Sequence, residues 1–225
     1  MIAGGYDQQD NASNIVEIID LINPAFQYKW NDVRAARVGS IGGILQNQPL
    51  ICGGSDPDVI FTNSNNGIIL RSNKELQLIK RRRFASSVVL NDTRLWVCGG
   101  RDKGWDRMNS SEFISLDQPP EDGPKLPFNV SDHCMVQVDS KSIYLIGGFQ
   151  NGKLSKKTWI IDPTNNFEMK EGPEMNNIRV GCSCATMRLN NKTFIVVFGR
   201  LYFTDSEIPE ILDTSLPTNN WKYGK

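Results

Sequence analysis

Pairs of adjacent glycines, spaced almost evenly along the chain, constrain this sequence more than any other feature. Each pair closes a short apolar run: MIAGG, LICGG, WVCGG and YLIGG, which place the pairs at Gly4 and Gly5, Gly53 and Gly54, Gly99 and Gly100, and Gly147 and Gly148. The first glycines are 49, 46 and 48 residues apart, and a degenerate fifth run, VVFG, ends at Gly199 with Phe198 in the first place. Adjacent glycines indicate a backbone that bends, or is closely approached, where a side chain would clash. The even spacing predicts a chain built from repeated units.

A second feature, an aspartate, recurs with nearly the same spacing as the glycine pairs. An aspartate closes an apolar segment after four of the five runs, at Asp20, Asp117, Asp162 and Asp213, whereas the second unit has Arg71 at that place. An aromatic residue follows the aspartate in three units, and in the last unit it is Trp221. Because the glycine pairs and the aspartates recur together, a chance origin of the pattern is implausible.

Each unit is expected to contain four short strands. Apolar segments such as SSVVL at 86–90 and RLWVC at 94–98 are joined by turn-forming residues such as NDT, and no stretch has a convincing helical period. Short strands with frequent turn signals are typical of all-β proteins. The expected units cover approximately 1–34, 35–80, 81–128, 129–178 and 179–225, and the first of them lacks its first strand.

Together these features resemble the kelch repeat. The resemblance covers essentially all 225 residues, and it implies an all-β propeller with one four-stranded antiparallel blade per unit. A WD-type propeller is the natural competitor, but the Trp105–Asp106 dipeptide occurs once and follows a glycine pair instead of ending a strand. About five blades are present. They either close imperfectly or form part of a six- or seven-bladed ring, and we favour the second interpretation.

Composition narrows the class of partner. Lys plus Arg and Asp plus Glu each number 25, so the net charge is zero. The overall charge therefore favours neither nucleic acid nor a membrane surface as a partner. The longest apolar runs, such as FIVVF at 194–198, have the length of a strand. No signal peptide is evident and the five cysteines are an odd number, which favours a reducing, cytoplasmic location. Five glycosylation sequons, at Asn11, Asn91, Asn109, Asn129 and Asn191, leave an extracellular location open.

One face of the expected fold carries the candidate binding residues. The loops from second to third strands and the links between units emerge on the same face, and they vary in length and chemistry. Variable loops on a rigid scaffold are where binding specificity usually lies. Arginine and tryptophan are common interface anchors. The candidate partner-binding residues are Arg37, Arg83, Arg101, Trp105, Arg107 and Arg179. The alternative for each arginine is a salt bridge between neighbouring loops.

The remaining chemical signals favour structural roles. KRRRF at 80–84 could be a nucleic-acid or nuclear-import patch, but its surroundings are neutral. Cys52 and Cys98 precede glycine pairs at core positions, and Cys182 and Cys184 lie on an expected strand, so all four are interpreted as structural thiols. His133 is the only histidine and no nucleophile motif is present. No metal, cofactor or catalytic residue is therefore expected, and an oxidase-like or hydrolase-like enzyme domain is the disfavoured alternative.

The expected function is that of a protein-interaction module. In kelch propellers of ubiquitin-ligase adaptors, this face often holds acidic peptides, and the resemblance therefore implies a protein partner with exposed carboxylates, held by bidentate arginine contacts. The same resemblance makes substrate recognition for a ubiquitin ligase a specific version of this hypothesis. Such adaptors join a BTB domain to the propeller, and none is recognisable in these 225 residues, so that version rests on analogy.

Overall fold

The structure is a computed structural model that describes residues 2–3, 8–9, 11–13, 15–19, 27–30, 38–54, 58–63, 69–199, 208–216 and 220–224. Every regular element within these ranges is a β-strand, which confirms the all-β prediction for this part of the chain. No helix long and apolar enough to cross a membrane occurs in the same ranges. Four residues of the sequence predictions, Gly4, Gly5, Asp20 and Arg37, lie outside the described residues.

Four antiparallel sheets have four strands each, and in each sheet the strands follow one another in chain order. The first contains β4 (Ser40–Leu45), β5 (Gln48–Gly53), β6 (Asp58–Asn63) and β7 (Ile69–Gln77). The second contains β8 (Ser86–Leu90), β9 (Arg94–Cys98), β10 (Ser111–Ile114) and β11 (Glu121–Asp122). The third contains β13 (Cys134–Asp139), β14 (Ser142–Ile146), β17 (Thr158–Asp162) and β18 (Glu168–Glu171). The fourth contains β19 (Ser183–Leu189), β20 (Lys192–Phe198), β21 (Glu210–Asp213) and β22 (Lys222–Tyr223).

Two smaller antiparallel sheets have three strands each. One, near the N-terminus, contains β1 (Ile2–Ala3), β2 (Val16–Ile19) and β3 (Gln27–Trp30). The other contains β12 (Val130–Ser131), β15 (Phe149–Gln150) and β16 (Lys153–Leu154). This second small sheet joins the link that precedes β13 to the loop between β14 and β17.

The core lies between the faces of successive sheets. Strand β9 shows the arrangement, because Leu95 and Val97 pack towards the sheet β4–β7 while Trp96 and Cys98 pack towards the sheet β13–β18. All four side chains are fully buried. A strand covered on both faces has no polar side, which explains why RLWVC is an apolar run and not an alternating one.

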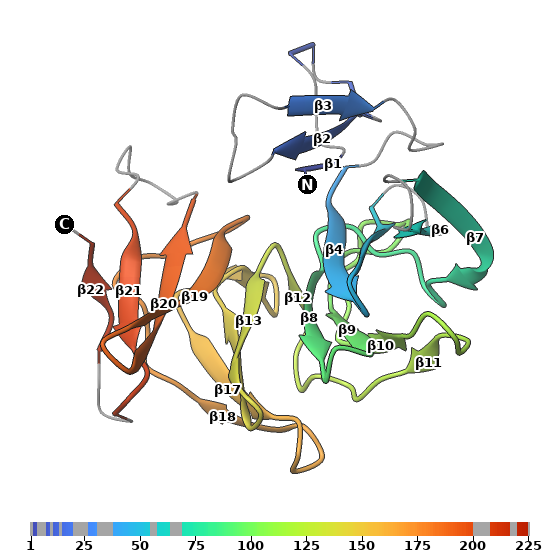
Figure 1. The fold of residues 1–225 in the computed structure, drawn as a ribbon. Coiled ribbons are helices and arrows are strands. Elements are labelled where there is room, and N and C mark those ends of the chain that lie inside the picture. Colours follow the sequence, from blue (N-terminus) through green and yellow to red (C-terminus); the bar gives the residue numbers. More distant parts are fainter. Residues whose placement is uncertain are drawn as a thin grey trace.

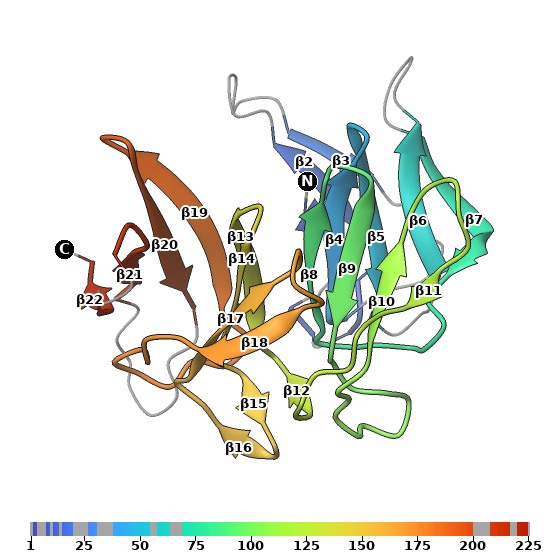
Figure 2. The same ribbon diagram turned by 90° about the horizontal axis from the view of Figure 1, so that it is seen from below.

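The first strands of these sheets lie next to one another in chain order. Strand β4 contacts β8, β8 contacts β13, and β13 contacts β19. Figure 1 shows the sheets set around a common centre with these strands inward and β7, β11, β18 and β22 outward. In Figure 2 the loops between β9 and β10, the link that contains β12, and the hairpin of β15 and β16 lie at the same end of the strands.

The glycine pairs join each sheet to the next one. The amide of the second glycine, at Gly54, Gly100 and Gly148, donates a hydrogen bond to the carbonyl oxygen of Arg82, Val130 and Arg179, respectively. A Cβ on the first glycine would lie 2.5–2.8 Å from that same oxygen. All six glycines have φ between 62° and 92°. The pairs therefore require glycine both for their backbone conformation and for the close approach of the neighbouring chain segment.

The segments that enter the first strands are connected by a second set of backbone hydrogen bonds. Phe84 donates to Gly39, Asp132 donates to Phe84, and Gly181 donates to Asp132, with N–O distances of 2.7–2.9 Å. All four residues have a positive φ, between 55° and 67°. This continuous chain of hydrogen bonds, which we call the entry belt, links the four large sheets at the end that carries the variable loops.

The recurring aspartates lie at turns. Oδ1 of Asp162 accepts hydrogen bonds from the amide and hydroxyl of Thr164, and Oδ1 of Asp213 accepts the equivalent pair from Ser215. These bonds lower the pKa of Asp162 and lower that of Asp213 to about 2. Asp117 is exposed at the corresponding turn. Trp221 is buried, and its indole nitrogen donates to the carbonyl oxygen of Pro173 in the neighbouring unit.

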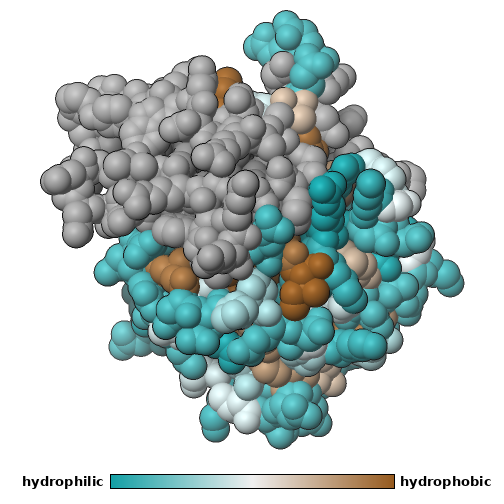
Figure 3. All heavy atoms as spheres, turned by 90° about the vertical axis from the view of Figure 1, so that its right-hand side faces the viewer, coloured by the Kyte–Doolittle hydropathy of each residue, from teal (hydrophilic) through white to brown (hydrophobic). Residues whose placement is uncertain are grey.

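The described surface on the side of the molecule that carries β11 is mostly polar (Figure 3). Figure 3 shows that the described part of this surface is mostly hydrophilic, with small separate groups of apolar residues. Those candidate binding residues that the structure describes lie elsewhere, at the loop end of the sheets.

Candidate functional site

Three of the predicted arginines are brought together by backbone pairing. Arg83 forms an antiparallel bridge with Arg101, and Arg101 forms one with Arg107. Arg83 belongs to the link before β8, whereas the other two belong to the loop between β9 and β10. Like charges on neighbouring rungs of a ladder repel one another. This local arrangement is therefore unfavourable by itself, and other groups must stabilise it.

Trp105 and Phe149 provide part of that stabilisation. The guanidinium carbons of Arg83 and Arg101 lie 4.9 Å and 5.9 Å from the centre of the Trp105 ring. Those of Arg101 and Arg107 lie 5.5 Å and 4.3 Å from the Phe149 ring. Cation–π contacts of this kind contribute about 0.5–1 kcal/mol each at exposed sites. Sequence analysis identified Trp105 but missed Phe149, because no spacing rule connects it to the arginines.

Trp105 is held in an unusual backbone conformation. Its φ is 71°, and half of its side-chain surface is exposed. The turn is fixed by Asp102, whose carbonyl oxygen accepts from Trp105 N and whose carboxylate accepts from the amides of Gly104 and Asp106. A positive φ is rare for a bulky residue and often marks functional sites. The loop therefore presents a large aromatic ring to solvent at an energetic cost to the fold.

A single carboxylate compensates part of the positive charge. Asp132 Oδ2 accepts from Arg101 at 3.1 Å and from the Ser131 hydroxyl at 2.7 Å, and that hydroxyl in turn accepts from Arg107 Nε at 3.2 Å. Desolvation and the neighbouring Arg101 lower the pKa of Arg107. We call this group the arginine–tryptophan surface; it consists of Arg83, Arg101, Trp105, Arg107 and Phe149. It holds three guanidinium groups against one carboxylate.

Arg179 differs from the other predicted partner-binding residues. Its side chain is fully buried, and its guanidinium donates to the Glu210 carboxylate and to the carbonyl oxygens of Gly199 and Ile208. The prediction placed Arg179 with exposed arginines. The structure corrects this, because every part of the guanidinium is used within the fold.

The structural counterpart of Arg179 is Arg82, not Arg83. Arg82 is also fully buried, and it donates to the Glu112 carboxylate and to the carbonyl oxygens of Gly99 and Ser110. The carbonyl oxygens of Arg82 and Arg179 accept equivalent bonds from the second glycines. Counted along the sequence, Arg37 and Arg83 each lie 16 residues before a glycine pair, which matches Arg83 with Arg37 and with Arg179. The structure shows that this match is wrong by one residue at the unit of Arg83.

Two buried glutamates complete these networks, and sequence analysis missed both. The Glu112 carboxylate accepts from the amides of Ile79 and Lys80, and the Glu210 carboxylate accepts from those of Asn176 and Asn177. In both cases the two amides lie three and two residues before the buried arginine. Each glutamate thus ties the link that enters a sheet to the third strand of the same sheet.

The thiols take no part in the arginine–tryptophan surface. Cys52 and Cys98 are fully buried, and Cys134 Sγ lies 3.4 Å from Cys182 Sγ between β13 and β19. Burial raises the pKa of Cys98 and of Cys134. No group of three metal-ligating side chains occurs among the residues that the structure describes.

His133 is buried next to the arginine–tryptophan surface but does not contribute to it. Neither ring nitrogen has a hydrogen-bond partner in the described part of the chain, and burial lowers the pKa of the imidazole to about 3. The ring is therefore neutral at physiological pH. It fills the space between Gly99 and Gly148, where a Cβ on either glycine would meet it.

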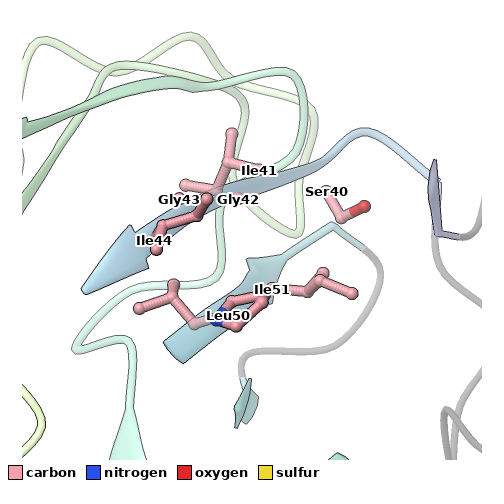
Figure 4. A pocket seen from close by; sticks show the side chains of 8 residues that line it. Ser40, Ile41, Gly42, Gly43, Ile44, Leu50 and Ile51 are labelled. Atoms are coloured by element: carbon pink, nitrogen blue, oxygen red, sulfur yellow. The ribbon is translucent and has the colours of Figure 1, made fainter. Parts of the chain in front are cut away.

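A separate hollow of about 350 Å³ lies over β4 and β5. Figure 4 shows its lining, which includes Ile41, Ile44, Leu50 and Ile51, with Ser40 at one end. Its lining contains no titratable side chain, so this hollow offers no group for acid–base or nucleophilic chemistry.

Comparison with known proteins gives no independent assignment, because no family model and no curated protein matches this chain.

Proposed function

We propose that this protein is an interaction module that binds an acidic segment of a partner protein at the arginine–tryptophan surface. The observation that carries the proposal is the exposed Trp105 ring beside three guanidinium groups on neighbouring rungs. Arg101 binds the Asp132 carboxylate directly, and Arg107 is connected to it through the Ser131 hydroxyl. Such a cluster is unfavourable in the free protein, and a ligand that brings carboxylates relieves the repulsion.

The residue types fit peptide recognition. Arginine binds carboxylates through two parallel N–H donors, and tryptophan supplies a large contact area with little loss of conformational entropy. Both are enriched among the residues that contribute most to protein–protein binding. Rigid support is also present, because the entry belt and the Asp102 turn fix the backbone beneath the surface.

We further propose that the four-stranded sheets are blades of a kelch-type propeller. Three observations support this interpretation: the glycine pairs that join successive sheets, the entry belt, and the first strands that follow one another around a common centre. The blade number remains the one expected from the sequence, about five or part of a six- or seven-bladed ring. A role as the substrate-recognition part of a ubiquitin-ligase adaptor, and a cytoplasmic location, stay predictions based on the resemblance and on the cysteine content.

The interpretation as a non-enzyme is part of the same proposal. His133 has the pKa of a buried, neutral ring and faces glycines instead of a nucleophile. The buried carboxylates of Glu112 and Glu210 are occupied by backbone amides and arginines. None of these groups is available to transfer a proton to a substrate.

The test is a selection of binding peptides from a random library, followed by affinity measurements with fluorescence polarisation. We expect selected peptides to be rich in Asp and Glu. Trp105→Ala should weaken their binding about 30-fold, which corresponds to about 2 kcal/mol. Arg101→Ala with Arg107→Ala should have a similar effect, and thermal unfolding should show that these variants remain folded.

The matched control removes cations at the opposite end of the strands. Lys141 lies at the turn between β13 and β14, and Arg188 lies near the end of β19, just before the turn to β20. Lys141→Ala with Arg188→Ala should leave affinity unchanged. Selected peptides without acidic residues, or equal loss of affinity in the control, would contradict the proposal.

A further inference from the structure

A pocket of about 560 Å³ lies beside the arginine–tryptophan surface and shares Arg107 with it. Three segments form it: the link before β8 with Lys80 and Arg81, the loop from Asp102 to Ser110, and the segment from Lys125 to Asn129. The three segments are distant in sequence and belong to the end of the sheets that carries the variable loops.

The lining of this pocket is strongly basic. Five cationic side chains line it, namely Lys80, Arg81, Lys103, Arg107 and Lys125. None of the five forms an ion pair within the part of the chain that the structure describes, whereas seven other cations in that part do. The single carboxylate in the lining, that of Asp102, accepts two amide hydrogen bonds from its own turn. We call these residues the basic pocket.

Backbone contacts hold the three segments in place. The amide of Lys80 donates to the buried Glu112 carboxylate, which also binds Arg82 directly behind the pocket. Leu126 N donates to Asn109 O at 2.7 Å, and Met108 N donates to Gly100 O at 2.9 Å. The cationic side chains therefore start from fixed backbone positions, so a ligand does not need to order the loops before it binds.

We propose that the basic pocket binds the phosphate group of a phosphorylated side chain in the partner protein. A phosphomonoester carries a charge of about −1.5 to −2 at neutral pH and three acceptor oxygens, more than a carboxylate provides. Lysine binds phosphate as a point charge and arginine as a fork, and both types line the pocket. An excess of four positive charges matches a dianion better than a single carboxylate.

This inference rests on the proposed function, because the two sites share one side chain. Arg107 lines the basic pocket and also stacks on Phe149 in the arginine–tryptophan surface. A peptide that places an acidic residue over Trp105 and continues past Arg107 would bring its next side chains to Lys103 and Lys125. The phosphate and the acidic residues thus belong to one bound segment.

The experiment uses three labelled peptide pools that contain fixed acidic residues and differ at one position, which is phosphoserine, serine or glutamate. Binding to the full chain is measured by fluorescence polarisation. The phosphoserine pool should bind about tenfold more tightly than either other pool, and Lys80→Ala/Arg81→Ala/Lys125→Ala should abolish this difference. Lys141→Ala/Arg188→Ala/Lys192→Ala, which removes three cations at the opposite end, should preserve it.

Each other result has a defined meaning. Equal affinity for the three pools overturns the phosphate site but leaves the proposed function intact, whereas no binding by any pool overturns both. Competition by inorganic phosphate at the same concentration as the phosphoserine pool would show a free-anion site and overturn the peptide assignment. Displacement by single-stranded oligothymidylate at lower concentration than the phosphoserine pool would show a nucleic-acid surface and overturn it as well.

Discussion

The sheets β8–β11 and β19–β22 have the same strand order and contain the same buried arginine–glutamate network, but they differ in how much of each is covered. In β8–β11 both faces of the second strand pack against a neighbouring sheet. In β19–β22, Ile195 and Val197 pack towards β13–β18, whereas Met187 and Leu189 on the other face of the sheet are about half exposed.

This difference explains why the glycine pair degenerates in the last unit. At Gly99 a Cβ would lie 2.5 Å from the carbonyl oxygen of Val130, which belongs to the next sheet. Phe198 occupies the corresponding place in β20 and is half exposed. The first glycine is thus required by the close approach of the neighbour in addition to its own positive φ, and Phe198, which is not among the residues with a positive φ, meets neither condition.

The largest expected effects come from the networks that the two sheets share. Arg82→Met and Arg179→Met each leave a buried glutamate without its cation, so each should lower the free energy of unfolding by about 3–5 kcal/mol. Urea denaturation measures both. Arg81→Met, at the exposed neighbour, should change it by less than about 0.5 kcal/mol. Equal effects at Arg81 and Arg82 would contradict the assignment of the buried position. Arg82→Met/Glu112→Gln, which removes the unpaired charge but keeps an oxygen that can accept from the amides of Ile79 or Lys80, should recover part of the loss.

The covered and uncovered faces can be compared with one substitution at two places. Leu95→Ala leaves a cavity between two sheets, where the side chain is fully buried, and should cost about 2–5 kcal/mol. Leu189→Ala removes a side chain that is 55% exposed and should cost less than about 0.5 kcal/mol. Similar losses at both sites would show that another sheet or segment covers the outer face of β19–β22.

A smaller effect depends on pH. Burial between sheets lowers the folded-state pKa of His133 to about 3, below the unfolded-state value of 6.5. The unfolded chain therefore binds the proton first, and stability is lost as the pH falls from about 6.5 towards 3. At pH 4.5 this contribution is about 2–3 kcal/mol relative to pH 7.

His133→Leu tests this linkage, because leucine fills part of the same space and does not titrate. The substitution should flatten the dependence of unfolding free energy on pH between 6.5 and 4.5, measured by urea denaturation at each pH. An unchanged slope would mean that His133 is accessible to solvent or paired in the folded state.

The sequence by itself determined the strand order, the all-β class and the places where the backbone needs glycine. Those features depend on local patterns, because apolar runs and glycine conformations are encoded in a few adjacent residues. Sequence analysis also placed Arg83, Arg101, Trp105 and Arg107 in variable loops at one end of the strands.

Only the tertiary structure decided which arginines are buried. Arg82 and Arg83 are adjacent, yet one is enclosed by Glu112 and Ser110 while the other stacks on Trp105. Neighbouring residues of an extended chain point to opposite sides, so a shift of one residue exchanges an interior position for a surface one. Because the loops vary in length, the spacing of the arginines along the sequence does not reveal such a shift. The packing of each link against the third strand of its sheet fixes it, through contacts about 30 residues apart in sequence.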